Sequence, residues 1–314
     1  MTKIAFLFPG QGSQFVGMGK DLYDNYKAAK HVFDTADSVL NKKISSICIN
    51  GPEEDLKQTI NTQPAIVTMS IAALEVLKSE LNIEPDYTAG HSLGEYCAMY
   101  ASGVMSFENT LKTIQKRAEL MSMVQGGSMA AVLNATDEQL KSGLEEGAKA
   151  GYVDIANYNS PSQVVITGDS DAVKAACDYM TAHGVRRVVP LAVSGAFHSK
   201  YMENAGDEFK EFVANVELFN AKVPVITNVD AQITTSAEDF RIKMPKQIYS
   251  SVLWTQTIQK MVSEGVDIFI EIGPGKVLAG LNKKITPDSI VYNIYDSESL
   301  HNTIEALSSQ MAEV

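Results

Sequence analysis

Short apolar segments alternate with longer segments of helical periodicity along most of this chain, and few architectures accommodate that alternation. The segments with helical spacing of apolar residues are 13–25, 29–40, 64–80, 93–100, 107–124 and 199–215. The short apolar segments that are typical of strands are 4–8, 87–89, 223–227 and 268–271. Strands that are separated by helices pair in parallel, and the helices pack on both faces of the sheet. The sequence therefore predicts an α/β fold built on a mostly parallel sheet.

The middle of the chain has a different order of elements, which begins after the glycine pair 126–127. The pattern predicts, in order, a strand at 130–133, a helix at 137–150, strands at 153–156 and 163–167, a helix at 171–183 and a strand at 187–191. Thr136 and Gln139 have the spacing of a capping box at the start of the first helix, and Gly184 is suited to end the second. This βαββαβ order is typical of a ferredoxin-like unit.

The length of the chain, 314 residues, suits about two domains and a core that needs neither disulfides nor metal ions. No linker or repeat divides the sequence, so a second domain would be inserted into the first. We expect residues 126–195 to form an inserted ferredoxin-like subdomain, and 1–125 and 196–314 to form the core. The alternative is that the strands of 126–195 extend the larger sheet.

Composition excludes several classes of protein. With 45% hydrophobic and 20% charged residues, the chain is neither disordered nor fibrous. Its longest apolar-rich stretch, 65–77, contains two hydroxyl residues and a glutamate, whereas a membrane span needs ~18 apolar residues. The apolar run 4–8 is stopped by Pro9 and Gly10, unlike a secretory signal. The three cysteines are widely spaced, so we expect free thiols, no metal site and a cytoplasmic location.

The charge balance is acidic, with 26 basic residues against 38 acidic residues and a net charge of −12. DNA and RNA are bound mainly through their phosphates, so this balance disfavours nucleic acid as a partner. Basic clusters at 112–117 and 186–187 are the candidates for local contact with an acidic partner, although most such clusters are solvated faces.

The strongest local motif is Gly-His-Ser-Leu-Gly at 90–94, which fits the G-x-S-x-G nucleophile elbow. In such a turn a strand meets a helix so sharply that a Cβ on either side of the serine would clash. The turn exposes Ser92 Oγ at the start of the helix, where free amide groups favour a developing negative charge. A five-residue pattern also occurs by chance, and the strand before this one is short. The motif alone therefore leaves an acyl-transferring serine and an ordinary turn as alternatives.

A nucleophilic serine needs a base, and His198 is the best candidate. It follows the run 194–197, in a loop that closes the middle segment and precedes a helix. A neutral imidazole there can accept the proton of Ser92 and return it to a leaving group. The alternative is a loop histidine bonded only to backbone. The other histidines lie inside the elbow, on predicted surface helices or near the C-terminus: His91, His31, His183 and His301.

A hydrolase triad would place an acid between the serine and the histidine in chain order. The acidic residues considered for that role, Asp154, Asp169 and Asp171, all fall in the middle segment and in no obvious active-site loop. We therefore expect a serine–histidine dyad that a backbone carbonyl orients.

A second glycine-containing loop, Pro-Gly-Gln-Gly-Ser-Gln at 9–14, joins the first strand to the first helix. It lacks the Lys-Ser/Thr of a phosphate loop and the spacing of a dinucleotide fingerprint. Its backbone amides can serve as oxyanion donors, with the Gln11 side chain in the same crevice. The alternative is an ordinary strand–helix connection.

Six features stand in order along the chain: GQGSQ at 10–14, NTQPA at 61–65, GHSLGEY at 90–96, Arg117, GAFHS at 195–199 and EIGPG at 271–275. Together these features resemble the malonyl-CoA:acyl carrier protein transacylase family and the related acyltransferase domains of polyketide and fatty acid synthases. The resemblance covers nearly the whole chain, with the motifs in the family's order, and it implies an α/β-hydrolase-like core with a ferredoxin-like insert.

The resemblance implies a reaction and a set of roles. Ser92 would take a malonyl group from malonyl-CoA and pass it to the phosphopantetheine thiol of acyl carrier protein, for fatty acid or polyketide synthesis. His198 matches the family's base, and the backbone amides of Gln11 and Leu93 match its oxyanion hole. Arg117 matches the arginine that binds the malonyl carboxylate, for which a planar guanidinium is suited.

The resemblance also implies supporting residues. Gln63 matches a pocket glutamine, the backbone carbonyl of Gln247 matches the group that orients the histidine, and Asn157 and Asn159 match asparagines near the pocket wall. Phe197 matches a bulky aromatic that goes with selection of malonyl over methyl-branched units, because it fills the space of an α-methyl group.

One departure weakens the prediction of selectivity, since Gly195 stands where the synthase relatives often carry a larger residue. We expect no cofactor, no membrane or nucleic-acid partner, and a monomer. Two other functions are considered: a serine hydrolase that uses the same elbow, which Arg117 and the missing acid argue against, and a non-catalytic module that docks carrier protein.

Overall fold

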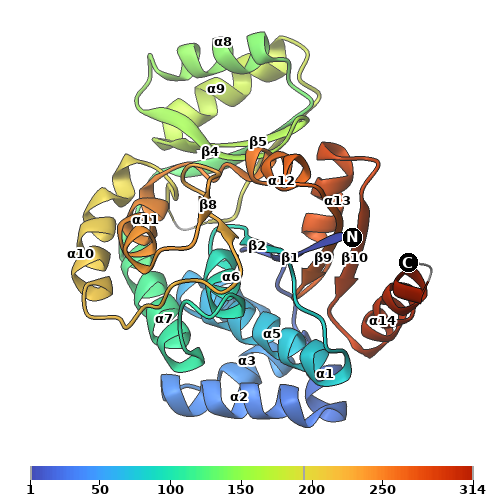
Figure 1. Cartoon of the computed structure of the whole chain (residues 1–314). Coiled ribbons are helices and arrows are strands. Elements are labelled where there is room, and N and C mark those ends of the chain that lie inside the picture. The colour runs from blue at the N-terminus through green and yellow to red at the C-terminus, as the bar shows by residue number, and fades with distance from the viewer. Residues whose placement is uncertain (1, 194, 313–314) are drawn as a thin grey trace.

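The central sheet is α/β in character and mostly parallel, as the alternation of elements predicts (Figure 1). The computed structural model describes residues 2–193 and 195–312. In this part of the chain a six-stranded sheet has the order β10-β9-β1-β2-β7-β8, and only β7 and β8 pair antiparallel. Its strands are β1 (Lys3–Phe8), β2 (Tyr87–Gly90), β7 (Val225–Ile226), β8 (Ile233–Thr234), β9 (Val266–Ile272) and β10 (Ile290–Ile294).

Both faces of this sheet are buried, which explains why β1 is apolar at nearly every position. Phe6 and Phe8 face the larger layer of helices, whereas Ala5 and Leu7 face the smaller one. The smaller layer consists of α12 (Trp254–Ser263) and α13 (Val277–Ile285). The larger layer includes α2 (Lys27–Leu40), α5 (Thr59–Glu80), α6 (Gly94–Ala101), α7 (Phe107–Met123) and α10 (Glu203–Val213).

The remaining helices are short or lie outside these two layers. They are α1 (Lys20–Asn25), α3 (Ile44–Asn50), α4 (Glu53–Lys57), η1 (Lys200–Met202), α11 (Ala237–Tyr249) and α14 (Ser297–Ala312).

The predicted helix at 13–25 is wrong over its first half, which consists of irregular backbone at 13–15 and turns at 16–19. Gly12, Gly17 and Gly19 have φ values of 100°, 98° and 76°, a left-handed conformation that interrupts a helix. The predicted helix at 64–80 begins earlier, at Thr59, with Pro64 inside it. Its first turns carry polar residues that are nevertheless buried, so apolar periodicity does not reveal them.

The middle segment forms an antiparallel sheet of its own, so the alternative that it extends the larger sheet is wrong. Its strand order is β4-β5-β3-β6, and the element order is the predicted βαββαβ. Thr136 and Gln139 make the predicted capping box. This sheet lies beside α12, with α8 and α9 on its far side (Figure 1). The elements are β3 (Ser128–Leu133), α8 (Asp137–Gly147), β4 (Val153–Ser160), β5 (Gln163–Gly168), α9 (Ser170–Ala182) and β6 (Arg187–Pro190).

The helix α5 has the length and hydropathy of a membrane span, but 89% of its most apolar window is buried within the molecule. It therefore serves as a core helix of the larger layer. The cysteines Cys48, Cys97 and Cys177 are free thiols, the first two of them buried.

Candidate active site

The run 90–94 has the strand–turn–helix geometry that the elbow motif predicts. Ser92 has a φ of 52°, in the left-handed region, between the end of β2 and the start of α6. A Cβ on Gly90 would lie 1.9 Å from the carbonyl carbon of Gly94, and a Cβ on Gly94 would lie 2.2 Å from the carbonyl oxygen of Phe8. Backbone passes too close at both positions for any residue but glycine.

The side chains of Ser92 and His198 meet although they are 106 residues apart in the chain, with Oγ 2.8 Å from Nε2. The Nδ1 atom of His198 lies 3.0 Å from the carbonyl oxygens of both Gln247 and Ser250. Carbonyl oxygens only accept hydrogen bonds, so Nδ1 carries the proton and Nε2 is left as the acceptor for the serine hydroxyl. The expected dyad, oriented by backbone carbonyls, is the arrangement found.

The imidazole of His198 is buried, with 6% of its surface exposed. Burial, followed by the positive charge of Arg117, lowers the pKa of His198 to about 3. The ring is therefore uncharged at physiological pH, as a base that must accept a proton requires.

Arg117 is buried beside the serine, with 1% of its surface exposed. Its Nη2 donates to Ser92 Oγ and to Gln247 Oε1, both at 3.0 Å, and its Nη1 donates to Gln63 Oε1 at 2.6 Å. The guanidinium also lies over the ring of Tyr96, 5.6 Å from its centre. Burial lowers the pKa of Arg117, yet a guanidinium keeps its proton in proteins. Arg117 is thus not part of a basic surface cluster with its neighbours on α7.

No carboxylate among the described residues lies within ion-pair distance of Arg117, whose bonded partners are all uncharged. A buried cation without a carboxylate in direct contact is costly, and it is suited to accept an anionic ligand. The arrangement can therefore hold a carboxylate next to the serine oxygen.

These groups open into a small cavity of about 100 Å³. Asn157 lines it from the second sheet, whereas Asn159 instead bonds to Nε2 of His91 at 2.7 Å. His91 also packs beside the Trp254 ring, so its Nε2 is engaged away from Ser92. The lining residues are Gln11, Gln63, His91, Ser92, Leu93, Arg117, Met121, Met129, Asn157, Leu191, Val193, Phe197 and His198.

The backbone amides predicted for an oxyanion hole, those of Gln11 and Leu93, both belong to residues that line this cavity. Neither amide donates to another group in the described part of the chain. The site thus brings together the serine, the histidine, the arginine and the two residues whose amides are predicted to form the oxyanion hole.

Two side chains that bond to the peptide groups of Ser92 were missed by sequence reasoning. Asn228 Oδ1 accepts from the backbone N–H of Ser92 at 2.8 Å, and the side-chain amide of Gln247 donates to the carbonyl of Ser92 at 2.8 Å. Only the backbone of Gln247 was expected to act. The signal for Asn228 was its place just after a strand, because the carboxyl ends of neighbouring parallel strands meet at one edge of the sheet.

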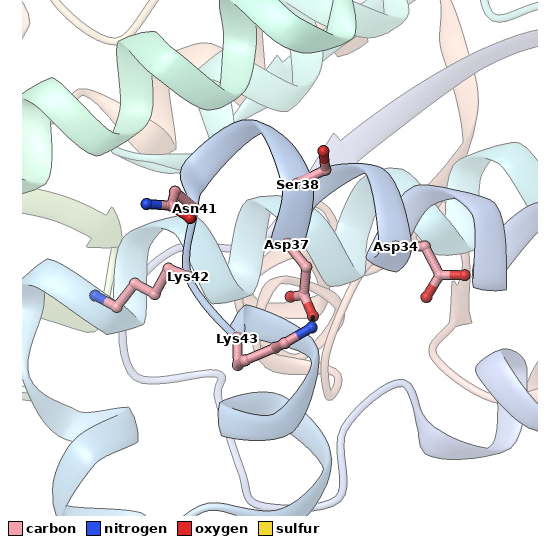
Figure 2. A pocket seen from close by; sticks show the side chains of 6 residues that line it. All are labelled: Asp34, Asp37, Ser38, Asn41, Lys42 and Lys43. Atoms are coloured by element: carbon pink, nitrogen blue, oxygen red, sulfur yellow. Dashed lines mark ion pairs between the residues drawn. The ribbon is translucent and has the colours of Figure 1, made fainter.

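A separate cavity of about 530 Å³ lies at the end of α2 (Figure 2). Asp37 in its wall pairs with Lys43 at 3.5 Å and accepts from the backbone and hydroxyl of Ser45. These contacts join α2 to the start of α3, so the packing of the two helices explains Asp37 and Lys43, two of the polar groups of this cavity.

Comparison with known proteins places the chain in a family. Residues 5–290 match the acyl transferase domain. The chain is 45% identical over 314 residues to the malonyl CoA-acyl carrier protein transacylase of Bacillus subtilis (strain 168), covering 99% of both chains. It is 42% identical over 307 residues to the protein of the same name from Staphylococcus aureus (strain MRSA252), covering 96% of this chain and 98% of the relative.

Solved structures agree with this assignment. An acyl carrier protein S-malonyltransferase from Vibrio cholerae superposes with a TM-score of 0.92 at 38% identity, covering 96% of this chain and all of the other. A malonyl-transacylase in complex with a type II PKS acyl-carrier protein superposes with a TM-score of 0.94 at 36% identity, covering 97% of this chain and all of the other. The chain therefore belongs to the acyltransferases, in the malonyl CoA-acyl carrier protein transacylase family.

Proposed function

We propose that this chain moves a malonyl group from malonyl-CoA to the phosphopantetheine thiol of acyl carrier protein, through a malonyl ester on Ser92. The observation that carries the proposal is the pair of contacts on one serine oxygen. His198 Nε2 lies 2.8 Å from Ser92 Oγ, and Arg117 Nη2 lies 3.0 Å from it. A base and an unpaired cation on one nucleophile suit an acyl group that itself carries a carboxylate.

In the first half-reaction Ser92 gives its proton to His198 Nε2, and Oγ attacks the thioester carbonyl. The amides of Gln11 and Leu93 stabilise the oxyanion of the tetrahedral intermediate. When that intermediate collapses, the C–S bond breaks and the imidazolium returns the proton to the sulfur of CoA. The second half-reaction reverses these steps, with the carrier's thiol as nucleophile and Ser92 as leaving group.

Arg117 binds the malonyl carboxylate through two charge-assisted hydrogen bonds, while Gln63 and Gln247 hold the guanidinium. The charge of Arg117 is one of the causes that lower the pKa of His198. Neutralising that charge with the substrate's carboxylate raises this pKa and makes the imidazole a stronger base. The bound carboxylate also occupies part of a small cavity, which helps keep water from the ester.

The direct test is intact mass spectrometry after incubation with malonyl-CoA. The wild type is expected to gain the mass of one malonyl group and the Ser92→Ala variant none. Retention of the increment by Ser92→Ala would refute the assignment of the nucleophile, and its absence from the wild type would favour a docking module.

The hydrolase alternative is tested by following CoA release with and without the phosphopantetheine-bearing carrier. A transferase is expected to release about one equivalent of CoA without the carrier and to turn over with it. Sustained release without the carrier would favour hydrolysis.

The remaining parts of the proposal concern organisation. Residues 126–195 form the inserted subdomain, which the separate sheet of this segment supports. The chain works as a monomer without a cofactor, and sedimentation velocity tests its state of association. A reducing compartment, the cytoplasm, is supported by the three free thiols.

A further inference from the structure

The conformation of Ser92 needs support from outside its own turn. A residue with a side chain and a φ of 52° is strained, and such a residue persists only where its surroundings fix it. We propose that Asn228 is a positioning residue that fixes the elbow by bonding to both sides of it. The inference rests on the proposed function of Ser92 as the nucleophile.

The side-chain amide of Asn228 bridges the two peptide groups that flank His91. Its Oδ1 accepts from the N–H of Ser92 and its Nδ2 donates to the carbonyl of Gly90, both at 2.8 Å. Asn228 is fully buried, so water does not compete for these bonds. Backbone groups in a parallel sheet bond in the same way. There a residue bonds to the carbonyl of the residue before its partner and to the N–H of the residue after its partner.

The side chain of Asn228 makes these bonds at the point where the pairing of β7 with β2 ends. The strand β7 ends at Ile226, while the neighbouring β2 continues to Gly90. The side chain of Asn228 therefore supplies the bonds that a longer β7 would have given, and it does so at the turn, where the chain leaves the sheet.

The backbone of Asn228 is itself fixed by the elbow's helix. Its N–H donates to Glu95 Oε2 at 2.6 Å, and its carbonyl accepts from the N–H of Leu253 at 3.0 Å. Glu95 lies in the first turn of α6 with 1% of its surface exposed. Asn228, which bonds to the turn, is thus itself held by Glu95 of α6, the helix that starts at this turn.

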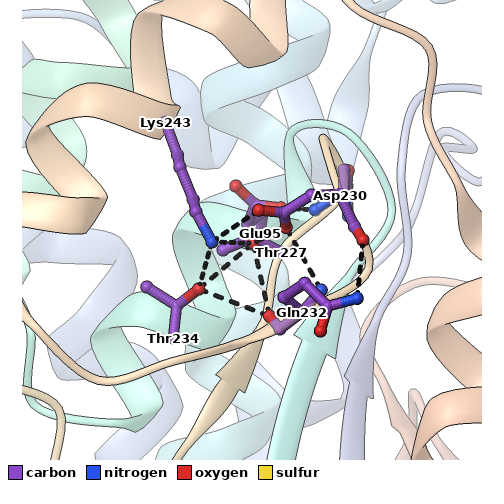
Figure 3. Close-up of polar contacts among 7 residues, drawn as sticks. Glu95, Thr227, Asp230, Gln232, Thr234 and Lys243 are labelled. Carbon is purple, nitrogen blue, oxygen red and sulfur yellow. Dashed lines mark hydrogen bonds and ion pairs between the residues drawn. The ribbon is translucent and has the colours of Figure 1, made fainter.

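A polar cluster anchors the segment that carries Asn228 to α11 (Figure 3). Lys243 of α11 pairs with Asp230 at 2.8 Å and donates to Thr234 at 2.7 Å. One turn further along α11, the side chain of Gln247 donates to the carbonyl of Ser92. Both peptide groups of Ser92 are therefore held by amide side chains. Asn228 lies on the segment that Lys243 anchors, and Gln247 lies on the same helix as Lys243.

This arrangement predicts a specific defect when the bridge is lost. With its N–H released, Ser92 can relax out of the left-handed region, which displaces Oγ from His198 and turns the amide of Leu93. A displacement of 1 Å can cost about 10²-fold in rate. The binding of the malonyl carboxylate depends on Arg117, so it should be preserved.

The experiment compares Asn228→Ala and Asn228→Asp with the wild type. Two single-turnover rates are measured: malonylation of Ser92 by malonyl-CoA, and labelling of Ser92 by a small fluorophosphonate that needs no carboxylate pocket. In Asn228→Ala both rates should fall about 100-fold, with the concentration of malonyl-CoA at half-saturation within about threefold of the wild type. Asn228→Asp keeps an acceptor for the N–H of Ser92 and should recover part of both rates.

The control is Asn282→Ala, which truncates another fully buried asparagine, on α13, whose side-chain amide has no hydrogen-bond partner in the described part of the chain. Thermal unfolding compares the stability of the two alanine variants. Asn282→Ala should keep both rates, whatever its effect on stability. Rates in Asn228→Ala close to those of the wild type, or no lower than those of Asn282→Ala, would overturn the proposal.

The two readouts separate this inference from the proposed function. Suppose that the wild type does not accept malonyl, but the fluorophosphonate labels the wild type faster than Asn228→Ala. Malonyl transfer would then be refuted and the positioning role would stand. Normal malonylation of Asn228→Ala would refute the positioning role alone.

Discussion

At the scale of single residues, the site places a buried cation beside a buried base, and the charge of the cation lowers the pKa of the base. Arg117 contacts the same serine oxygen as His198, and its charge lowers the pKa of the imidazole. The free site is therefore adjusted for a ligand that brings a negative charge. An uncharged acyl group would leave Arg117 unpaired and His198 a weaker base.

The first prediction concerns this cation. Arg117→Ala should lower kcat/KM for malonyl-CoA by roughly 10- to 150-fold, the equivalent of the ~1.5–3 kcal/mol of a charged hydrogen bond. The same variant should use acetyl-CoA better relative to malonyl-CoA, because no unpaired cation remains. Steady-state kinetics with both donors checks it, and an unchanged preference for malonyl would contradict the carboxylate-binding role.

A second prediction concerns pH. Since the pKa of His198 falls from its ordinary 6.5 to about 3, the ring loses its basic form only well below neutral pH. The pH profile of kcat/KM reports groups of the free enzyme, so it should show no acid limb from His198 between about pH 5 and pH 8. Removing the charge of Arg117 should move any such limb to higher pH. A limb near 6.5 in the wild type would show that the imidazole is not desolvated as described.

At the scale of elements, the elbow depends on how closely three backbone segments approach one another: the end of β1, the end of β2 and the start of α6. The helix α6 starts against the end of β1, where Gly94 passes the carbonyl of Phe8. Near this contact Gln11, which follows β1, and Leu93, which precedes α6, line one cavity. The geometry of the site is thus set by backbone contacts as much as by side chains.

The third prediction compares two glycines in helices. Gly94→Ala should lower the acylation rate by about 10²-fold or more, because its Cβ would lie 2.2 Å from a carbonyl oxygen and displace the turn. Gly280→Ala on α13 meets nothing within 4 Å and should stabilise the chain by about 0.4–1 kcal/mol. Single-turnover acylation and urea unfolding measure the two effects. Equal behaviour of both variants would contradict the close-approach argument.

At the scale of the whole molecule, the site lies between the two sheets. Ser92 and Leu93 come from the six-stranded sheet and its helix, whereas Met129 and Asn157 come from the antiparallel sheet. The cavity is therefore completed only when both parts of the chain are folded and packed.

The fourth prediction concerns the carrier protein. The net charge of −12 repels an acidic partner, so such a carrier must meet a local group of lysines and arginines. Rising salt screens that contact and should raise the apparent KM for the carrier, while KM for malonyl-CoA changes less. Kinetics over a salt series, with potassium chloride as the salt, test this. A flat response would remove the electrostatic contact from the proposal.

Local features of the sequence were enough to predict much of the fold. The periodicity of 29–40 and 107–124 matched α2 and α7 closely, and the alternation of elements gave the parallel sheet. The glycines at 90 and 94 predicted the elbow because the reason for them is local steric exclusion. The helix predicted at 13–25 failed over its first half because glycine conformations, which periodicity ignores, decided the backbone there, whereas its second half is the helix α1.

By itself, the sequence determined the elements, the elbow and, through motifs that resemble a family, the pairing of Ser92 with His198 and Arg117. Only the tertiary structure decided which side chains bond to the peptide groups of Ser92. Asn228 and the side chain of Gln247 act on its peptide groups from 136 and 155 residues away. Propensity and spacing act over a few residues, whereas a buried amide must find whichever partner the packed chain brings within about 3 Å.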